Sequence, residues 1–247
     1  MHSRNRHIGW DERIIEGFIS FLDRFGGKAN SEEPRKKFLG YNDLLDLLKD
    51  MQCPVCSILK RSINHYVATA FIEEVANGEF REGMRSSLGY CRRHSVFVQN
   101  IVPRRLHGMG VAIVYEDLVE QVRVNLTKDP FENILEQNHC ALCSFESELS
   151  DYAFRLIADY CNDPEFQNTY EKSRGLCFPH MRSLCERLDG NALKFILYEH
   201  ERKLSILSTH LVEFQRKSTS QFSSEHITQE EARSWQMAAR FMAGDMG

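Results

Sequence analysis

Residues 53–56 read CPVC and residues 89–94 read GYCRRH, and the chain contains this pattern of cysteine and histidine twice. In the second copy, residues 140–143 read CALC and residues 175–180 read GLCFPH. The second copy follows the first by 87 residues for the paired cysteines and by 86 residues for the Cys-x-x-His run. Six cysteines and two histidines that recur in register indicate a duplicated module.

The two copies also resemble each other outside these motifs. An aliphatic pair precedes the first motif in both, Leu47–Leu48 in one copy and Ile134–Leu135 in the other. A phenylalanine, Phe80 or Phe166, lies nine residues before the glycine that opens the second motif. We therefore interpret the chain as two tandem modules.

The motif residues are metal-ligand types at metal-ligand spacing. Two cysteines separated by two residues can place both sulfurs on one ion within a tight turn, which Pro54 favours in the first copy and Ala141 replaces in the second. A cysteine and a histidine with the same separation lie on one face of a helical turn, and Gly89 and Gly175 let the chain bend into that turn. Three thiolates and one imidazole form the closed shell of a structural zinc site. We expect one site in each module, made by Cys53, Cys56, Cys91 and His94 in the first and by Cys140, Cys143, Cys177 and His180 in the second.

Two zinc ions are the expected cofactors, and iron–sulfur clusters are the alternative, because thiolates bind both. Cluster proteins often carry closely grouped cysteines, whereas the two ligand pairs of each module lie far apart, so the spacing favours zinc. Three thiolates and a divalent ion leave a charge of about −1 at each site. Arg92, Arg93 and Arg174 lie close enough in sequence to offset that charge.

The remaining cysteines and one histidine have simpler interpretations. Cys161 and Cys185 have no counterpart in the first copy, so we expect them to be packing residues. His200 lies on the apolar face of a predicted helix, where a core histidine with satisfied hydrogen bonds is expected. The competing hypothesis, that all the motif cysteines are only small core residues, does not explain their fixed spacing.

Composition indicates an ordinary globular chain. Of the 247 residues, 42% are hydrophobic, which is enough for a buried core without crosslinks, and 27% are charged. The net charge of −4 argues against nucleic-acid binding. No secretory signal and no membrane span are expected, which predicts a cytoplasmic protein whose thiols stay reduced.

Helical periodicity runs through most of the chain. Apolar residues recur at helical spacing at residues 59–71 and 145–160, and the turn-forming runs Asn77–Gly78 and Asn162–Pro164 end these helices. Further helices are expected near the N-terminus, from Trp10 to Leu22 before Gly26–Gly27, and at residues 105–126, 191–216 and 228–242.

These elements predict a mainly α protein in four parts. Residues 1–40 form an N-terminal helix and linker, residues 41–128 the first metal-binding module, residues 129–217 the second module, and residues 218–247 a tail with a short helix. Each module is expected to hold its own metal site.

The predicted helix from Leu197 to Phe214 has apolar residues at steps of three and four, the spacing of a helix seam. Such a seam has to be buried. The favoured partner is the equivalent helix of the first module, near Val111, Val114, Leu118 and Val122. The alternative is a second copy of the chain or a protein partner. The N-terminal helix around Trp10 and the tail around Trp235 and Phe241 are expected to close the ends of the core.

The doubled motif resembles an uncharacterised, mostly prokaryotic family of proteins grouped as a domain of unknown function. The tail from Ala232–Trp235 through Phe241–Gly244 is similar to the end of that family. The likeness extends from about Tyr41 onward, and the second copy departs from it at Ala141. The resemblance implies no activity, since none is established for the family.

Four classes of function are compatible with these features to different degrees. An interaction or regulatory protein with structural zinc is favoured, because a closed shell leaves no open position for a substrate. A redox or electron-transfer protein is the alternative. A nucleic-acid-binding protein would need a basic face, and a Cys–His hydrolase would need residues that the metal occupies. No catalytic motif is present, which favours a protein that is not an enzyme.

Overall fold

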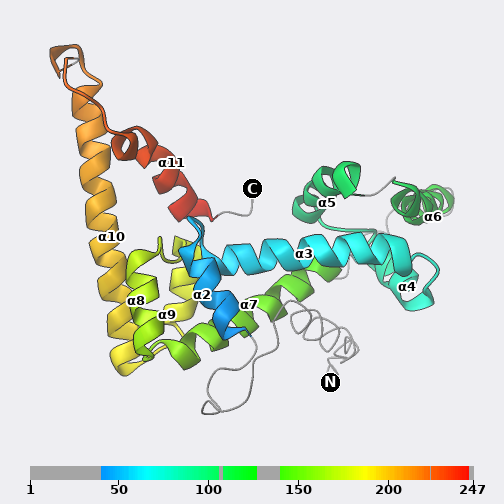
Figure 1. The fold of residues 1–247 in the computed structure, drawn as a ribbon. Helices are drawn as coiled ribbons and strands as arrows, with labels where there is room; N and C mark the ends of the chain where they lie inside the picture. Colours follow the sequence, from blue (N-terminus) through cyan, green and yellow to red (C-terminus); the bar gives the residue numbers. More distant parts are fainter. Residues whose placement is uncertain (1–39, 106–107, 127–139, 223, 245–247) are drawn as a thin grey trace, which may run out of the picture.

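The computed structural model describes residues 40–105, 108–126, 140–222 and 224–244, and these form helices joined by turns, with no strand among them (Figure 1). The predicted mainly α fold is confirmed. The predicted N-terminal helix and the linker after it lie outside the described residues. The described helices are α2 (Tyr41–Lys49), α3 (Pro54–Glu73), α4 (Gly78–Ser86), α5 (Arg92–Arg105), α6 (Met109–Leu126), α7 (Ala141–Tyr160), α8 (Pro164–Lys172), α9 (Phe178–Cys185), α10 (Gly190–Lys217) and α11 (Gln229–Ala243), with the 3-10 turn η1 (Ser220–Phe222).

Helices α3 and α7 form an antiparallel pair at the centre of the molecule (Figure 1). Each has 20 residues and begins directly after a motif cysteine. The ring of Tyr66, in the second half of α3, lies 5.0 Å from that of Phe145 near the start of α7. At the other end, Tyr41 of α2 lies 4.3 Å from Tyr160, the last residue of α7. A helix of 20 residues is about 30 Å long, so the pair has two well-separated ends.

A hydrophobic core lies at each end of this pair. The first core joins α2 and the start of α3 to the end of α7 and to α8, α9 and α10, through residues such as Leu59, Phe154 and Ile196. The second joins the rest of α3 to α4, α5, α6 and the start of α7, through residues such as Phe71 and Leu142. Residues of both predicted modules therefore contribute to each core.

Asparagine, aspartate and glycine residues at the turns cap the helices or let the chain bend between them. Asn77 and Asp163 were expected to end helices, and each also caps the next one, because its side chain accepts hydrogen bonds from two amides at the start of α4 or α8. Gly89 and Gly175 have φ angles of 88° and 76°, in the left-handed region that favours glycine. These two glycines make the bends expected before the Cys-x-x-His runs.

One helix boundary differs from the prediction. The helix predicted at residues 105–126 begins at Met109, as α6, and Arg105 is instead the last residue of α5. Gly108, directly before α6, has a φ of 72°, in the left-handed region that favours glycine. The predicted helices at residues 191–216 and 228–242 correspond closely to α10 and α11.

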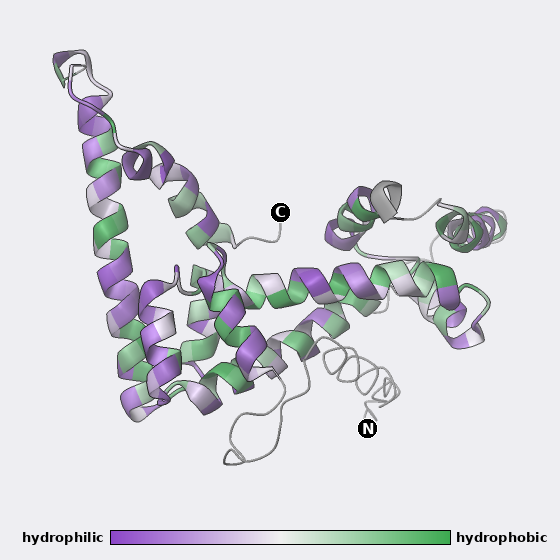
Figure 2. Ribbon diagram, viewed as in Figure 1, coloured by the Kyte–Doolittle hydropathy of each residue, from purple (hydrophilic) through white to green (hydrophobic). Residues whose placement is uncertain are grey.

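The partner predicted for α10 is wrong. Leu204, Leu207 and Leu211 are only partly exposed, but α10 packs against α11 and α9, whereas α6 packs against α3 and α4. Figure 2 shows hydrophilic and hydrophobic residues alternating along α10. The seam indicates that a partner exists, but its spacing does not distinguish α6 from α11.

Among the described helices, none is long and apolar enough to cross a membrane.

Candidate metal centres

The first candidate centre, called here the Cys53 cluster, contains Cys53, Cys56, Cys177 and His180. The His180 Nδ1 lies 3.5 Å from the Cys53 Sγ, 3.4 Å from the Cys56 Sγ and 3.2 Å from the Cys177 Sγ. The Sγ atoms of Cys56 and Cys177 are 3.8 Å apart. All three cysteines are buried. Four donor atoms thus converge on one point at the start of α3 and α9.

The second centre, called here the Cys91 cluster, contains Cys91, His94, Cys140 and Cys143. The His94 Nδ1 lies 3.4 Å from the Cys91 Sγ and 3.5 Å from the Sγ atoms of both Cys140 and Cys143. The Sγ atoms of Cys91 and Cys143 are 3.7 Å apart. This cluster lies at the start of α5 and α7, and its geometry repeats that of the first.

The ligands are exchanged between the predicted modules. We expected each module to complete its own site, but the structure brings the Cys-x-x-Cys pair of each to the Cys-x-x-His pair of the other. The reason is the antiparallel α3–α7 pair. Cys56 lies at the start of α3 and Cys91 lies near its other end, so the two residues are separated by the length of this helix. The start of α7 lies at the far end of α3, so Cys140 meets Cys91. The eight residues predicted as ligands are brought together, in two groups that spacing alone did not predict.

Helix N-termini provide the electrostatic environment of both clusters. Cys53, Cys140 and Cys177 are the residues that precede α3, α7 and α9, and Cys91 directly precedes α5. The first amides of a helix have no partner within the helix and carry partial positive charge. Each cluster therefore lies between two helix N-termini, an arrangement that stabilises thiolates.

The pKa values of His94 and His180 show that the groups around each ring favour its positively charged form. Burial alone would lower the pKa of His94, but hydrogen bonds with Cys140 and Glu146 raise it to about 9. Burial would likewise lower the pKa of His180, but the surrounding sulfurs of Cys177, Cys53 and Cys56 raise it to about 12. A divalent cation would occupy the place where these groups otherwise hold a proton.

The thiol of Cys140 shows the effect of the helix amides. Burial raises its pKa, but hydrogen bonds with His94 and with the amides of Cys91, Leu142 and Cys143 lower it to about 6. The backbone amides of this turn therefore favour the thiolate form of Cys140.

A carboxylate and a guanidinium that face His94 complete the Cys91 cluster. The His94 Nε2, on the ring edge away from the sulfurs, lies 3.5 Å from the Glu146 Oε2. Arg93 pairs with Glu146 and contacts the sulfur of Cys143, which agrees with its expected role in offsetting charge. Glu146 was not predicted, although its place three residues after Cys143 put it on the same helix face.

Three other residues have structural roles. Arg174, which was expected to offset charge, donates to the carbonyl oxygens of Met51 (3.2 Å) and Met237 (2.9 Å). Cys161 is fully buried in the first core and Cys185 is partly buried against it, so the packing role predicted for both is confirmed.

His200 is the buried core histidine that we expected. Its Nδ1 donates to the carbonyl of Ile196 (2.9 Å), and its Nε2 accepts from the amide of Leu176 (3.3 Å). Burial lowers its pKa, so the ring is neutral. By supporting Leu176, it helps to position Cys177.

Fold and site together define an all-helical protein with two Cys3His clusters able to hold metal ions. The model of a family of unknown function, DUF6062, matches residues 127–236. The chain is 23% identical over 206 residues to an uncharacterized 23.9 kDa protein in the xynA 3' region of Caldicellulosiruptor sp. (strain Rt8B.4), covering 81% of this chain and 99% of that protein. No solved structure matches the chain significantly. The resemblance to an uncharacterised domain family is confirmed, and these relatives assign no activity.

Proposed function

We propose that the protein binds two structural zinc ions, which fasten its two halves together, and that it serves as an interaction or regulatory module. The supporting observation is the spacing of the ligand atoms. A tetrahedral ion with Zn–S bonds of about 2.3 Å and Zn–N bonds of about 2.0 Å separates two sulfurs by about 3.8 Å and a sulfur from a nitrogen by about 3.5 Å. The recorded separations run from 3.2 to 3.8 Å, so little rearrangement is needed to hold such an ion.

The same spacing argues against the iron–sulfur alternative. Ligands of a cluster bind different iron atoms, so they have to lie further apart than ligands that share one ion. In both groups all four donor atoms lie within 4.8 Å of one another. A single ion with four protein ligands leaves no open position for a substrate, which favours a structural role over catalysis.

We infer that the two halves arose by duplication. Helices α3, α4 and α5 are followed by α7, α8 and α9 in the same order, with 20 residues in α3 and α7 and 9 residues in α4 and α8.

The cysteines indicate the compartment. All eight are free thiols, and six of them are needed as ligands. The protein therefore requires a reducing compartment, and we propose that this is the cytoplasm.

Elemental analysis of the full chain, purified without oxygen, tests this proposal. We expect about two zinc ions per chain and a colourless protein, because Zn²⁺ has a filled d shell. Brown protein with visible absorption and bound iron would support the cluster alternative. Folded protein with neither metal would contradict metal binding altogether.

A further inference from the structure

The C-terminal helix α11 ends against the Cys53 cluster. After α10 the chain reverses at η1, and α11 runs back towards the start of α3 (Figure 1). It ends at Ala243, and a Cβ added to the next residue, Gly244, would lie 3.3 Å from the Cys56 Sγ and 3.5 Å from the Cys177 Sγ. The Gly244 backbone therefore covers two of the three sulfurs directly.

Contacts near this end hold α11 closely on the cluster. The ring of Phe241 lies 6.2 Å from that of Phe178 and 6.4 Å from that of His200. Arg174 joins the carbonyl of Met237 in α11 to that of Met51, just before Cys53. The cavity between α11 and the cluster measures only about 10 Å³, about the size of one water molecule. Solvent thus has little access from this side.

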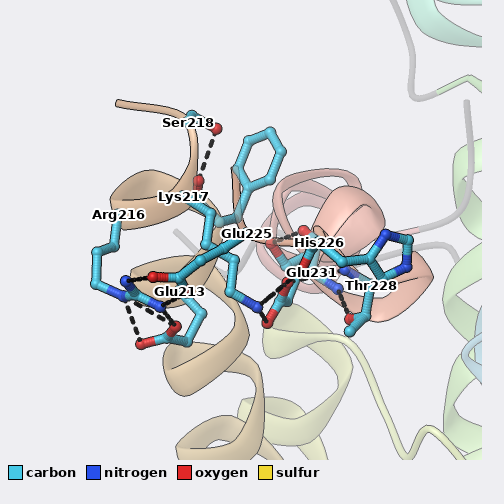
Figure 3. Close-up of polar contacts among 10 residues, drawn as sticks. Glu213, Arg216, Lys217, Ser218, Glu225, His226, Thr228 and Glu231 are labelled. Atoms are coloured by element: carbon cyan, nitrogen blue, oxygen red, sulfur yellow. Dashed lines mark hydrogen bonds and ion pairs between the residues drawn. The ribbon is translucent and has the colours of Figure 1, made fainter. Parts of the chain in front are cut away.

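The far end of α11 is fixed to α10 by a buried ion pair (Figure 3). The Nζ of Lys217 lies 2.7 and 2.9 Å from the carboxylate oxygens of Glu231 and donates to the carbonyl of His226. The side chains of Lys217 and Glu231 are only 12% and 8% exposed. Glu231 also forms a capping box with Thr228 at the start of α11. Contacts with α10 therefore fix the start of α11, and these contacts lie outside the Cys53 cluster.

The Cys91 cluster differs in its exposure. Cys53, Cys56 and Cys177 are at most 3% exposed, whereas Cys91 and Cys143 remain partly exposed in the described part of the chain. The Arg93 side chain beside Cys143 is 59% exposed, so this side of the cluster faces solvent. The two clusters have nearly the same geometry, but their sulfurs differ in exposure.

We propose that the Cys91 cluster is a reactive metal–thiolate centre, at which Cys91 and Cys143 exchange their ion and react with electrophiles, while α11 seals the Cys53 cluster. This rests on the proposed binding of two metal ions. An electrophile can reach the sulfurs of the Cys91 cluster directly, whereas the sulfurs of the Cys53 cluster become accessible only when α11 opens locally.

The test uses the zinc-loaded full chain and two probes, a chromogenic zinc chelator and N-ethylmaleimide. In the reaction with maleimide, the thiolate electron pair forms a carbon–sulfur bond, the maleimide double bond opens, and its second carbon takes a proton from water. We expect zinc release in two phases of about one equivalent each. Peptide mass spectrometry should find Cys91 and Cys143 modified at least about tenfold faster than Cys53, Cys56 and Cys177, because the sealed thiols require local opening.

Two variants test whether α11 protects the sulfurs of the Cys53 cluster, and a third is the control. Gly244→Val places a side chain against the sulfurs at a φ of 85°, and Lys217→Met removes the partner of Glu231 at the other end of α11. Both should accelerate the slow phase and leave the fast phase unchanged. Arg123→Met removes an exposed ion pair with Glu120 on α6 and should change neither. If Gly244→Val fails to fold, Lys217→Met still tests the seal.

The outcomes distinguish this inference from the proposed function. Fewer than two bound ions would contradict the proposed function itself. Two bound ions with all six cysteines modified at one rate, or with the Cys53 cluster modified first, would leave zinc binding intact and reject the inference. A slow phase unchanged in folded Lys217→Met and Gly244→Val variants would show that α11 is no seal.

Discussion

Among the described residues, His94 has polar partners at both edges of its ring, whereas His180 has them at one edge. The Nδ1 of His94 faces three sulfurs and its Nε2 faces the Glu146 carboxylate. A carboxylate in this place fixes the tautomer and makes the imidazole a better ligand. His180 has the ring of Phe154 at 5.9 Å, and the residue three positions after Cys56, which corresponds to Glu146, is Leu59. The two clusters therefore differ in the support of their histidines.

Replacing Glu146 with glutamine should weaken the Cys91 cluster selectively. We expect zinc affinity there to fall by about 10-fold to 100-fold, the usual effect of removing such a partner, while the Cys53 cluster keeps its affinity. Competition with a chelator of known affinity measures both. Glu148→Gln, an exposed change on the same helix, is the matched control. An affinity that falls equally in both variants, or in neither, would contradict the role given to Glu146.

At the scale of residues, the sequence predicted the eight residues that form the clusters but not the residues that support them. Doubled motifs with fixed spacing identify ligands, because few other functions require both the residue types and the intervals. Glu146 has the charge and spacing of many solvent-exposed helical glutamates, so only its position opposite His94 distinguishes it. The contact of Arg174 with α11 likewise depends on a helix that is distant in sequence.

Among the helices, α3 and α6 make an unusually close approach. A Cβ added to Gly110, in the first turn of α6, would lie 1.9 Å from the carbonyl oxygen of Phe71 and 3.0 Å from the side chain of Val75. No real side chain tolerates the first distance, so only glycine lets α6 start this close to the end of α3. This contact positions Val114 and Leu118 in the second core.

Gly110→Ala should destabilise the protein although alanine is the better helix former. Forcing a methyl group into a filled space costs about 1–3 kcal/mol or more, which exceeds the gain of about 1 kcal/mol in helix propensity. Gly83→Ala in α4 is the control, since nothing lies within 4 Å of its added Cβ, and it should be neutral or stabilising. Urea denaturation of both variants measures the difference. Equal stability of the two would mean that α3 and α6 do not pack this closely.

At the scale of elements, the long helices were predictable and their packing partners were not. The periodic segments of α3, α7 and α10 and the polar start of α11 carried clear signals. The short helices α4 and α8, of nine residues each, were not predicted, because the turn residues at their starts were interpreted only as the ends of the preceding helices. The seam of α10 could have packed on α6 or on α11 with the same spacing. The choice depends on the chain reversal at η1, which brings α11 back along α10.

For the whole molecule, the arrangement of the clusters means that each proposed ion would link the two halves. A metal held within one module would stabilise only that module. The Cys91 cluster joins motif pairs that are at least 46 positions apart, as in Cys140 and His94. The Cys53 cluster joins motif pairs that are at least 121 positions apart, as in Cys56 and Cys177. Binding energy at either cluster therefore becomes folding energy for the whole α3–α7 assembly. Sequence could not predict this, because two identical pairs of motifs can combine in two ways.

Paired serine substitutions distinguish the two combinations by metal content. Cys91→Ser with Cys140→Ser removes two ligands of one cluster, so we expect this variant to keep about one zinc ion, in the intact closed shell of the Cys53 cluster. Cys53→Ser with Cys91→Ser damages both clusters and should lose both ions, although both residues lie in the first module. Elemental analysis after dialysis against a weak chelator gives the count, and circular dichroism establishes whether each variant is folded. The four single variants of Cys53, Cys91, Cys140 and Cys177 serve as controls, and each should lose about one ion.

Ligation within each module predicts the reverse for the double variants, with the Cys53 and Cys91 pair keeping one ion and the Cys91 and Cys140 pair losing both. That reversed result would contradict the exchange of ligands and, with it, the link that each ion makes between the halves.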